Sequence, residues 1–173
     1  MPTQIDTTYD VVGLGEALLR LNPRDPQLLE QAGELEVHVG GSETNVLVGL
    51  ARLGLRTAWI SRMTDIPLGQ LIGHTLRGQE VDTAHLTWTS ENRVGLYFLA
   101  RGVPPRASRV YYDRGDSAMA HMTPADLPDT LFKQGRAYLL HTSGITAADQ
   151  PQCGTNRSHG DPEGKSGGLA GEF

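Results

Sequence analysis

Residues 40–45, with the sequence Gly-Gly-Ser-Glu-Thr-Asn, join an extended segment at residues 35–39 to a strongly helical one at residues 46–53. Two adjacent glycines let the backbone approach a ligand closely and take dihedral angles that are closed to other residues. Ser42, Glu43 and Asn45 place polar groups at the N-terminus of the helix that follows. We interpret residues 40–45 as a binding loop that suits sugar hydroxyls, the alternative being an ordinary loop with a helix cap.

Strand-like and helix-like segments alternate along the chain, which predicts a mostly parallel sheet covered by helices on both faces. Buried strands are expected at residues 9–14, 58–61 and 137–142. Between the first two strands, apolar residues recur at helical spacing over residues 46–53. Gly54 follows at the point where the end of a helix favours a residue that tolerates a left-handed conformation.

A second helix is expected at residues 67–77. Asp65 is its candidate N-terminal cap, and Gly78 is expected to end it. The stripe that faces the core is expected to hold Leu68, Leu71, Ile72 and Leu76.

Two regions break the alternation and predict a small second sheet beside the main one. Residues 17–21 and 35–39 resemble strands that flank the binding loop. Residues 94–100 and 109–113 resemble the two strands of a hairpin across a turn at residues 102–105.

The side chains of this hairpin alternate between its two faces. Val110, Tyr112 and Arg114 are expected to point to one side, and Tyr97 lies on the neighbouring strand. The alternative is an edge strand that exposes its aromatic side chains.

Composition narrows the class of protein. The chain has 173 residues, of which 38% are hydrophobic, enough for one medium domain with a core. The net charge is −5 and there is no basic cluster, so a nucleic-acid or anionic-membrane partner has no electrostatic support. The N-terminus is polar and no apolar run approaches the roughly 18 residues of a membrane span, so we expect a cytoplasmic protein. A single Cys153 and six histidines without paired helical spacing predict neither a disulfide nor a metal site.

Several segments, taken in order, resemble the ribokinase-like (PfkB) carbohydrate kinases and, more narrowly, the 2-keto-3-deoxygluconate kinases. The resemblance covers residues 10–147. The family segments are residues 11–16, 39–45 and 50–54, and the segments of the narrower group are residues 94–98, 110–114, 116–118 and 140–146.

The resemblance implies an α/β fold, with a doubly wound, mostly parallel sheet that is incomplete in this chain. Residues 1–148 would form the N-terminal part of such a kinase domain. Within it, about residues 17–39 and 94–114 would form a β-sheet lid that closes on the sugar.

The resemblance also implies roles for residues of the binding loop and the lid. Gly40, Gly41 and Asn45 would hold sugar hydroxyls. Tyr97 and Tyr112 would enclose the sugar from the lid side.

Arg114 is the residue that bears on the substrate. A guanidinium matches a carboxylate through two parallel charge-assisted hydrogen bonds, which favours a sugar acid. The alternative is a surface ion pair with Asp113 or Asp116. Three functions stay open: an ATP-dependent kinase of 2-keto-3-deoxygluconate, a related kinase of a neutral ketose or nucleoside, and a non-catalytic module that binds sugar acids. Self-association through the lid sheet is a further expectation.

The chain departs from the family in the residues that transfer the phosphoryl group. These kinases place a base and an anion hole in a Gly-Ala-Gly-Asp segment. Residues 169–173 lack the leading glycine and have Glu172 in place of the aspartate, and Gly164-Lys165-Ser166 lacks the glycine of a P-loop because His159 occupies its place. The intact family uses ATP and Mg, but we expect neither to bind this chain, no catalytic residue within it, and no activity.

Residues 149–173 hold six glycines and, among large apolar side chains, only Leu169 and Phe173. Such a composition predicts a disordered tail unrelated to the family. A frameshift near Ala148 or Asp149 is one hypothesis for its origin, because reading one base later permits the helix and strand that the family would have next. An ordinary linker is the other.

Overall fold

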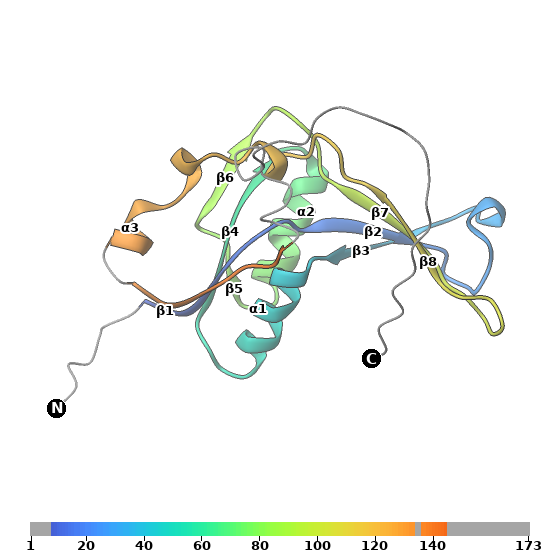
Figure 1. Cartoon of the computed structure of the whole chain (residues 1–173), viewed down its shortest axis with the longest axis horizontal. Helices are drawn as coiled ribbons and strands as arrows, with labels where there is room; N and C mark the ends of the chain where they lie inside the picture. The colour runs from blue at the N-terminus through green and yellow to red at the C-terminus, as the bar shows by residue number, and fades with distance from the viewer. Residues whose placement is uncertain (1–7, 134–135, 145–173) are drawn as a thin grey trace.

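The computed structural model describes residues 8–133 and 136–144, which form two sheets (Figure 1). The main sheet has the strand order β5-β4-β1-β9, with β6 also paired to β4, and the second sheet has the order β3-β2-β7-β8. Two predictions fall wholly or partly outside the described residues: the disordered tail at residues 149–173, and the end of the segment at residues 140–146.

All pairings within the main sheet are parallel, as predicted. Its strands are β1 (Tyr9–Leu14), β4 (Thr57–Thr64), β5 (Val81–Asp82), β6 (Leu86–Thr89) and β9 (Ala137–His141). β4 is longer than predicted because its first residues pair with β5 and its last ones with β6. Neither β5 nor β6 was predicted, since both are too short to show a periodic pattern.

Both longer helices, α1 (Ser42–Arg52) and α2 (Pro67–Arg77), cover the same face of the main sheet. Their core cluster includes Leu47, Ile72 and Leu76, packed with Trp59 of β4. Neither these helices nor any other in the described part of the chain is long and apolar enough to cross a membrane.

The opposite face of the main sheet, where helices are also predicted, is covered in the described residues by short helical segments. These are the 3-10 turns η2 (Met119–His121) and η3 (Pro124–Asp126) and the short helix α3 (Asp129–Lys133). Met119, Met122 and Leu131 pack on this face against β1 and β4. Pro124 and Pro128 interrupt this stretch and keep it from forming one continuous helix.

Helix α1 begins at Ser42, closer to the two glycines than predicted. Gly41 is its N-terminal cap, with an extended backbone (φ 174°), so Ser42 and Asn45 belong to the first turn of the helix rather than to a loop. Gly54 has the predicted left-handed conformation (φ 86°) just after the helix.

Helix α2 has the predicted bounds but not the predicted cap or inner face. The N-terminal cap is Ile66 rather than Asp65, and Pro67 in the first turn needs no partner for a backbone N–H. Leu68 and Leu71 are 45% and 42% exposed, so the predicted stripe is wrong for these two leucines. The inner face is formed instead by Gly69 and Gly73 together with the two predicted residues Ile72 and Leu76. The glycines let the helix lie close to the sheet, Gly69 against Thr64 of β4 and Gly73 against Trp88 of β6.

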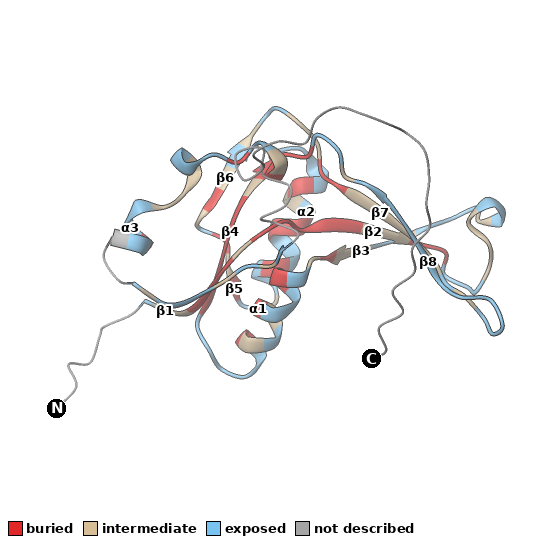
Figure 2. Cartoon of the chain, viewed as in Figure 1, coloured by how far each residue is buried: buried red, intermediate tan, exposed pale blue. Residues whose placement is uncertain are grey.

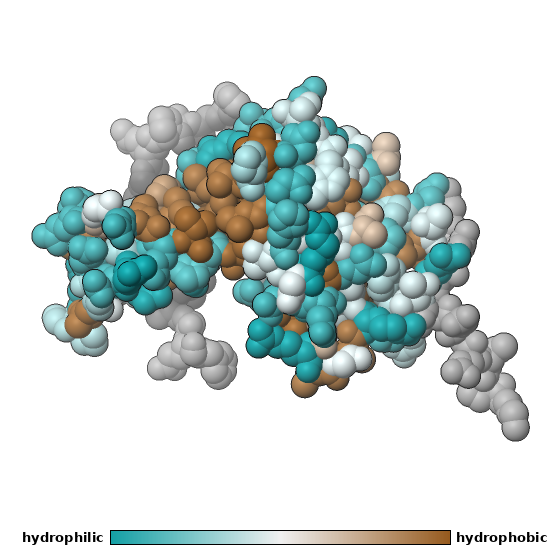
Figure 3. Space-filling view, turned by 180° about the vertical axis from the view of Figure 1, so that it is seen from behind, coloured by the Kyte–Doolittle hydropathy of each residue, from teal (hydrophilic) through white to brown (hydrophobic). Residues whose placement is uncertain are grey.

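The second sheet consists of β2 (Leu18–Asn22), β3 (Glu36–Gly40), β7 (Leu96–Ala100) and β8 (Arg109–Asp113), and the turn η1 (Leu29–Gln31) lies between β2 and β3. The predicted hairpin is present as the antiparallel pair β7–β8. β2 is largely buried and β8 is exposed along its length (Figure 2). Hydrophobic side chains gather where this sheet joins the main one (Figure 3).

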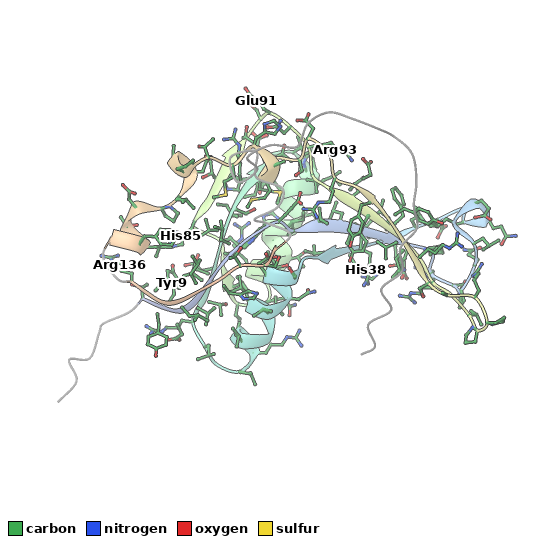
Figure 4. All side chains as sticks on the ribbon, viewed as in Figure 1. Tyr9, His38, His85, Glu91, Arg93 and Arg136 are labelled. Atoms are coloured by element: carbon green, nitrogen blue, oxygen red, sulfur yellow. The ribbon has the colours of Figure 1, made fainter. Side chains whose placement is uncertain are left out.

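Tyr9 links β1 to β5 across the intervening β4. Its hydroxyl donates a hydrogen bond of 2.5 Å to the carboxylate of Asp82, and the ring of His85 lies edge-on to it at 5.5 Å (Figure 4). Burial, followed by the hydrogen bond to Asp82, raises the pKa of Tyr9 to about 12.

The packing of α2 on β4 yields a stability prediction. A Cβ on Gly69 would overlap with the backbone oxygen of Thr64, which cannot move without disturbing the sheet. We expect Gly69→Ala to lower the free energy of unfolding by on the order of 1–3 kcal/mol. The matched control is Gly49→Ala in α1, where nothing lies within 4 Å of the added carbon, and which should stabilise by about 0.5–1 kcal/mol. Thermal unfolding of both variants measures the difference, and equal midpoints would contradict the close packing.

Candidate functional site

A cavity of about 280 Å³ lies where β1, β9, the start of α1 and the second sheet meet. Glu16 enters it just after the carboxyl end of β1, and Ser143 just after that of β9. Ligands of α/β proteins bind at this edge of the sheet, outside the carboxyl ends of parallel strands. All six predicted binding residues line the cavity: Gly40, Gly41, Asn45, Tyr97, Tyr112 and Arg114.

The two glycines allow close approach rather than unusual backbone angles. A Cβ on Gly40 would lie 2.5 Å from the hydroxyl of Tyr97, and one on Gly41 would lie 2.7 Å from the backbone oxygen of Glu16. Gly41 is extended, so the predicted need for dihedral angles closed to other residues is wrong there. The groups that come close are the protein's own, and contact of these glycines with a ligand stays a prediction.

Tyr97 and Tyr112 face each other across the β7–β8 pair. Their ring centroids are 5.8 Å apart and the rings are tilted by 39°. Tyr112 is 62% exposed and stands on an edge strand of the second sheet, as the alternative interpretation of the hairpin required. The same side chain nevertheless lines the cavity, so Tyr112 is both an exposed residue of the edge strand and part of the cavity wall.

Arg114 is bonded inside the cavity rather than on the surface. One of its terminal nitrogens lies 2.7 Å from Oε2 of Glu16, and the two side chains are 22% and 8% exposed. The expected alternative, a surface pair with Asp113 or Asp116, is therefore wrong.

Those two aspartates have other partners. Both terminal nitrogens of Arg93 contact the carboxylate of Asp113, at 2.7 and 2.8 Å, where β7 begins (Figure 4). Hydrogen bonds from Arg93 hold the pKa of Asp113 below its usual range. His121 contacts Asp116.

Glu16 lines the cavity beside Arg114 but is not among the predicted binding residues. Its burial is readable only in part, from its place between Gly15 and the apolar residues 17–19. Its partner stands far along the chain and shows no spacing relation to it.

Glu43 is the second carboxylate of the cavity and is 2% exposed. One oxygen accepts hydrogen bonds from the backbone N–H of Ser143 at 2.9 Å and from its hydroxyl at 2.7 Å. The other accepts from the hydroxyl of Ser42 at 2.6 Å. The charge lies in the first turn of α1, where the helix dipole favours it. Glu43 therefore ties the end of β9 to the start of α1.

The charges of the cavity favour hydroxyl groups over a polyphosphate. With every group ionised, two carboxylates and one guanidinium leave the lining with a formal charge of −1. Carboxylates accept from hydroxyls, and the amide of Asn45 and the tyrosine hydroxyls can both donate and accept. In the described residues no group of three or more His, Cys, Asp or Glu could hold a metal ion.

Comparison with known proteins agrees with the fold. Residues 8–153 match the model of the pfkB family carbohydrate kinases. The chain belongs to this family.

A curated relative, 2-dehydro-3-deoxygalactonokinase of Haloferax volcanii, is 36% identical over 141 residues, which are 82% of this chain and 43% of the relative. A 5-dehydro-2-deoxygluconokinase of Halalkalibacterium halodurans is 29% identical over 148 residues, or 84% of this chain and 44% of that protein. The chain thus spans less than half the length of these relatives.

Among solved structures, 2-dehydro-3-deoxygluconokinase of Thermotoga maritima superposes with a TM-score of 0.76 and 34% identity. The match covers 85% of this chain and 43% of that one. The expected ribokinase-like α/β fold with a small additional sheet is confirmed.

The hydrogen bonds of Glu43 yield a second stability prediction. Glu43→Ala removes the acceptor for three donors and should lower the free energy of unfolding by roughly 3 kcal/mol. It should also raise hydrogen exchange in residues 137–144. Glu43→Gln keeps an acceptor for Ser143 and can donate to Ser42. It is the matched control, and its free energy of unfolding should fall much less. If both variants unfold like the original chain, the carboxylate does not hold β9 to α1.

Proposed function

We propose that this chain forms the sugar-acid-binding part of an ATP-dependent kinase that acts on a 2-keto-3-deoxy sugar acid, with 2-keto-3-deoxygluconate as the substrate to test first. The observation that supports this most is the cavity itself, because its lining combines hydroxyl-binding groups with a guanidinium. The names of two relatives, a 2-dehydro-3-deoxygalactonokinase and a 2-dehydro-3-deoxygluconokinase, point to the same class of substrate.

In this proposal Glu16 orients the guanidinium of Arg114, and Arg114 binds the carboxylate of the sugar acid. Asn45 and the backbone at Gly40 and Gly41 hold hydroxyls. The rings of Tyr97 and Tyr112 cover the sugar from the second sheet, which then acts as a lid.

One observation favours a second candidate, a kinase of a neutral ketose or nucleoside. Glu16 already compensates the charge of Arg114, so the cavity does not require an anion to balance this pair. A neutral sugar would then bind by hydroxyl contacts alone. Binding of an acid and of a neutral ketose by the same protein separates the two candidates.

The phosphoryl donor in this proposal is ATP with Mg, as in the family that the chain resembles. The proposal assigns no base and no anion hole for transfer to this chain, because its sequence contains no Gly-Ala-Gly-Asp segment. The chain by itself is then a non-catalytic sugar-acid-binding module. Self-association through the second sheet and a cytoplasmic location stay predictions, and we propose no nucleic-acid or membrane partner.

The activity prediction is that the purified 173-residue chain does not phosphorylate 2-keto-3-deoxygluconate with ATP. An assay of ADP release measures this. Any release must be compared with that of Arg114→Ala purified in the same way, because a contaminating kinase would be unaffected by the substitution. Release that disappears in the variant would show that the chain is itself a kinase.

The substrate prediction concerns affinity. Arg114→Ala should weaken binding of 2-keto-3-deoxygluconate by about 2–3 kcal/mol, since it removes a charge-assisted pair, and should leave binding of fructose nearly unchanged. Calorimetric titration measures both sugars. Arg109→Ala, an exposed residue of β8, is the control and should bind as the original chain does. Unchanged affinity for the acid in Arg114→Ala would favour the neutral-sugar candidate.

A further inference from the structure

Four side chains lie in one row across the second sheet. The strand register pairs His38 of β3 with Arg20 of β2, Arg20 with Tyr97 of β7, and Tyr97 with Tyr112 of β8. Directly paired residues project from the same face of a sheet. Arg20 therefore stands on the face that carries both cavity tyrosines, immediately beside Tyr97.

Arg20 differs from the other arginine of this face in having no acidic partner. Arg114 is bonded to Glu16, whereas within residues 8–133 and 136–144 the side chain of Arg20 makes no ion pair or hydrogen bond. Its Nε is buried without a hydrogen-bond partner, and the residue as a whole is half-buried.

The neighbouring acid does not compensate Arg20. Glu36, on β3, lies 3.4 Å from the ring of His38 and 3.2 Å from Arg24, and hydrogen bonding to His38 contributes most to holding the pKa of Glu36 below its usual range. His38 is labelled on this sheet in Figure 4. The positive charge of Arg20 is thus left uncompensated at the side of Tyr97.

The charges that line the cavity suggest a role for Arg20 in binding an anion. Glu16 and Glu43 outnumber Arg114, so a bound carboxylate would meet a net negative lining unless a further cation lies near it. A guanidinium binds a carboxylate through paired N–H groups, and one terminal nitrogen of Arg114 is already bonded to Glu16.

We propose that Arg20 is a specificity-determining residue that binds the carboxylate of the sugar acid together with Arg114, at the side of the cavity formed by Tyr97. The inference rests on the proposed function, since it assigns a further contact to the same ligand. It orients the acid with its carboxylate toward the second sheet and its hydroxyls toward Glu43 and Asn45. A neutral sugar makes no use of Arg20.

The test is calorimetric titration of the full 173-residue chain and its variants with 2-keto-3-deoxygluconate and with fructose. Arg20→Gln should weaken binding of the acid roughly tenfold or more and leave binding of fructose unchanged. Arg20→Lys, which keeps the charge, should recover most of the affinity for the acid. Arg109→Gln, on the opposite face of the second sheet, is the matched control and should bind the acid normally.

The outcomes separate the inference from the proposed function. If the original chain binds the acid and Arg20→Gln binds it equally well, the inference is overturned and the proposed function stands. Equal weakening for the acid and for fructose would mean that Arg20 only supports Tyr97, which also overturns it. If the original chain does not bind the acid, the inference and the proposed function are both overturned.

A measurement on the unsubstituted chain covers the case in which Arg20→Gln does not fold. The side-chain N–H resonance of Arg20, assigned with Arg20→Lys, should shift on addition of the acid and not on addition of fructose. An unchanged resonance in the presence of bound acid overturns the inference.

Discussion

The carboxylate of Glu43 joins parts of the chain that are 100 residues apart in sequence. It can do so because β1 pairs in parallel with both β4 and β9, which brings the carboxyl ends of these strands to one edge of the main sheet. The N-terminus of α1 lies at the same edge, so the charge stands in a favourable dipole and receives donors from Ser42 and Ser143. A buried carboxylate is tolerated only when it is hydrogen-bonded in this way. The floor of the cavity depends on these bonds being made together.

The wall of the cavity depends on a second buried charge. Glu16 comes from the end of β1 and Arg114 from the residue after β8, so their ion pair connects the main sheet to the outer strand of the second sheet. A buried pair of this kind adds little net stability, because removing both charges from water offsets their attraction. The pair instead fixes the orientation of the Arg114 guanidinium. The guanidinium is held beside the tyrosines, whichever class of sugar enters.

Much of the fold was readable from the sequence, for physical reasons that differ between elements. β1 is a short apolar run, α2 has apolar residues at helical spacing, and the hairpin β7–β8 has both alternation and a turn signal, so their bounds were predicted closely. The strands β5 and β6 were missed because a few residues carry no period. The inner face of α2 was misjudged because hydrophobicity favours leucines, whereas the close approach to β4 and β6 is made through Gly69 and Gly73.

The site was predictable to a lesser degree. The resemblance selected six residues that prove to line one cavity, and spacing alone would not have grouped the loop at Gly40 with Tyr112. Glu16 and Ser143 were passed over because their importance comes from partners that only the folded chain brings near. The ion-pair alternative for Arg114 named the wrong partners for the same reason, since nearby aspartates were the only candidates visible in the sequence.

His38, Arg20, Tyr97 and Tyr112 share one face of the second sheet only because of the register of their strands. Each strand sends alternate side chains to opposite faces, so one residue inserted within β8 would turn Tyr112 away from the cavity while leaving the backbone ladder intact. Residues inserted in the connection between Ala100 and Arg109 would leave every facing side chain in place. Changes of length are therefore harmless in the turn and disruptive in the strand, even though both would preserve the sheet. Homologous kinases that differ by odd numbers of residues within these strands would present a different set of side chains to their substrates.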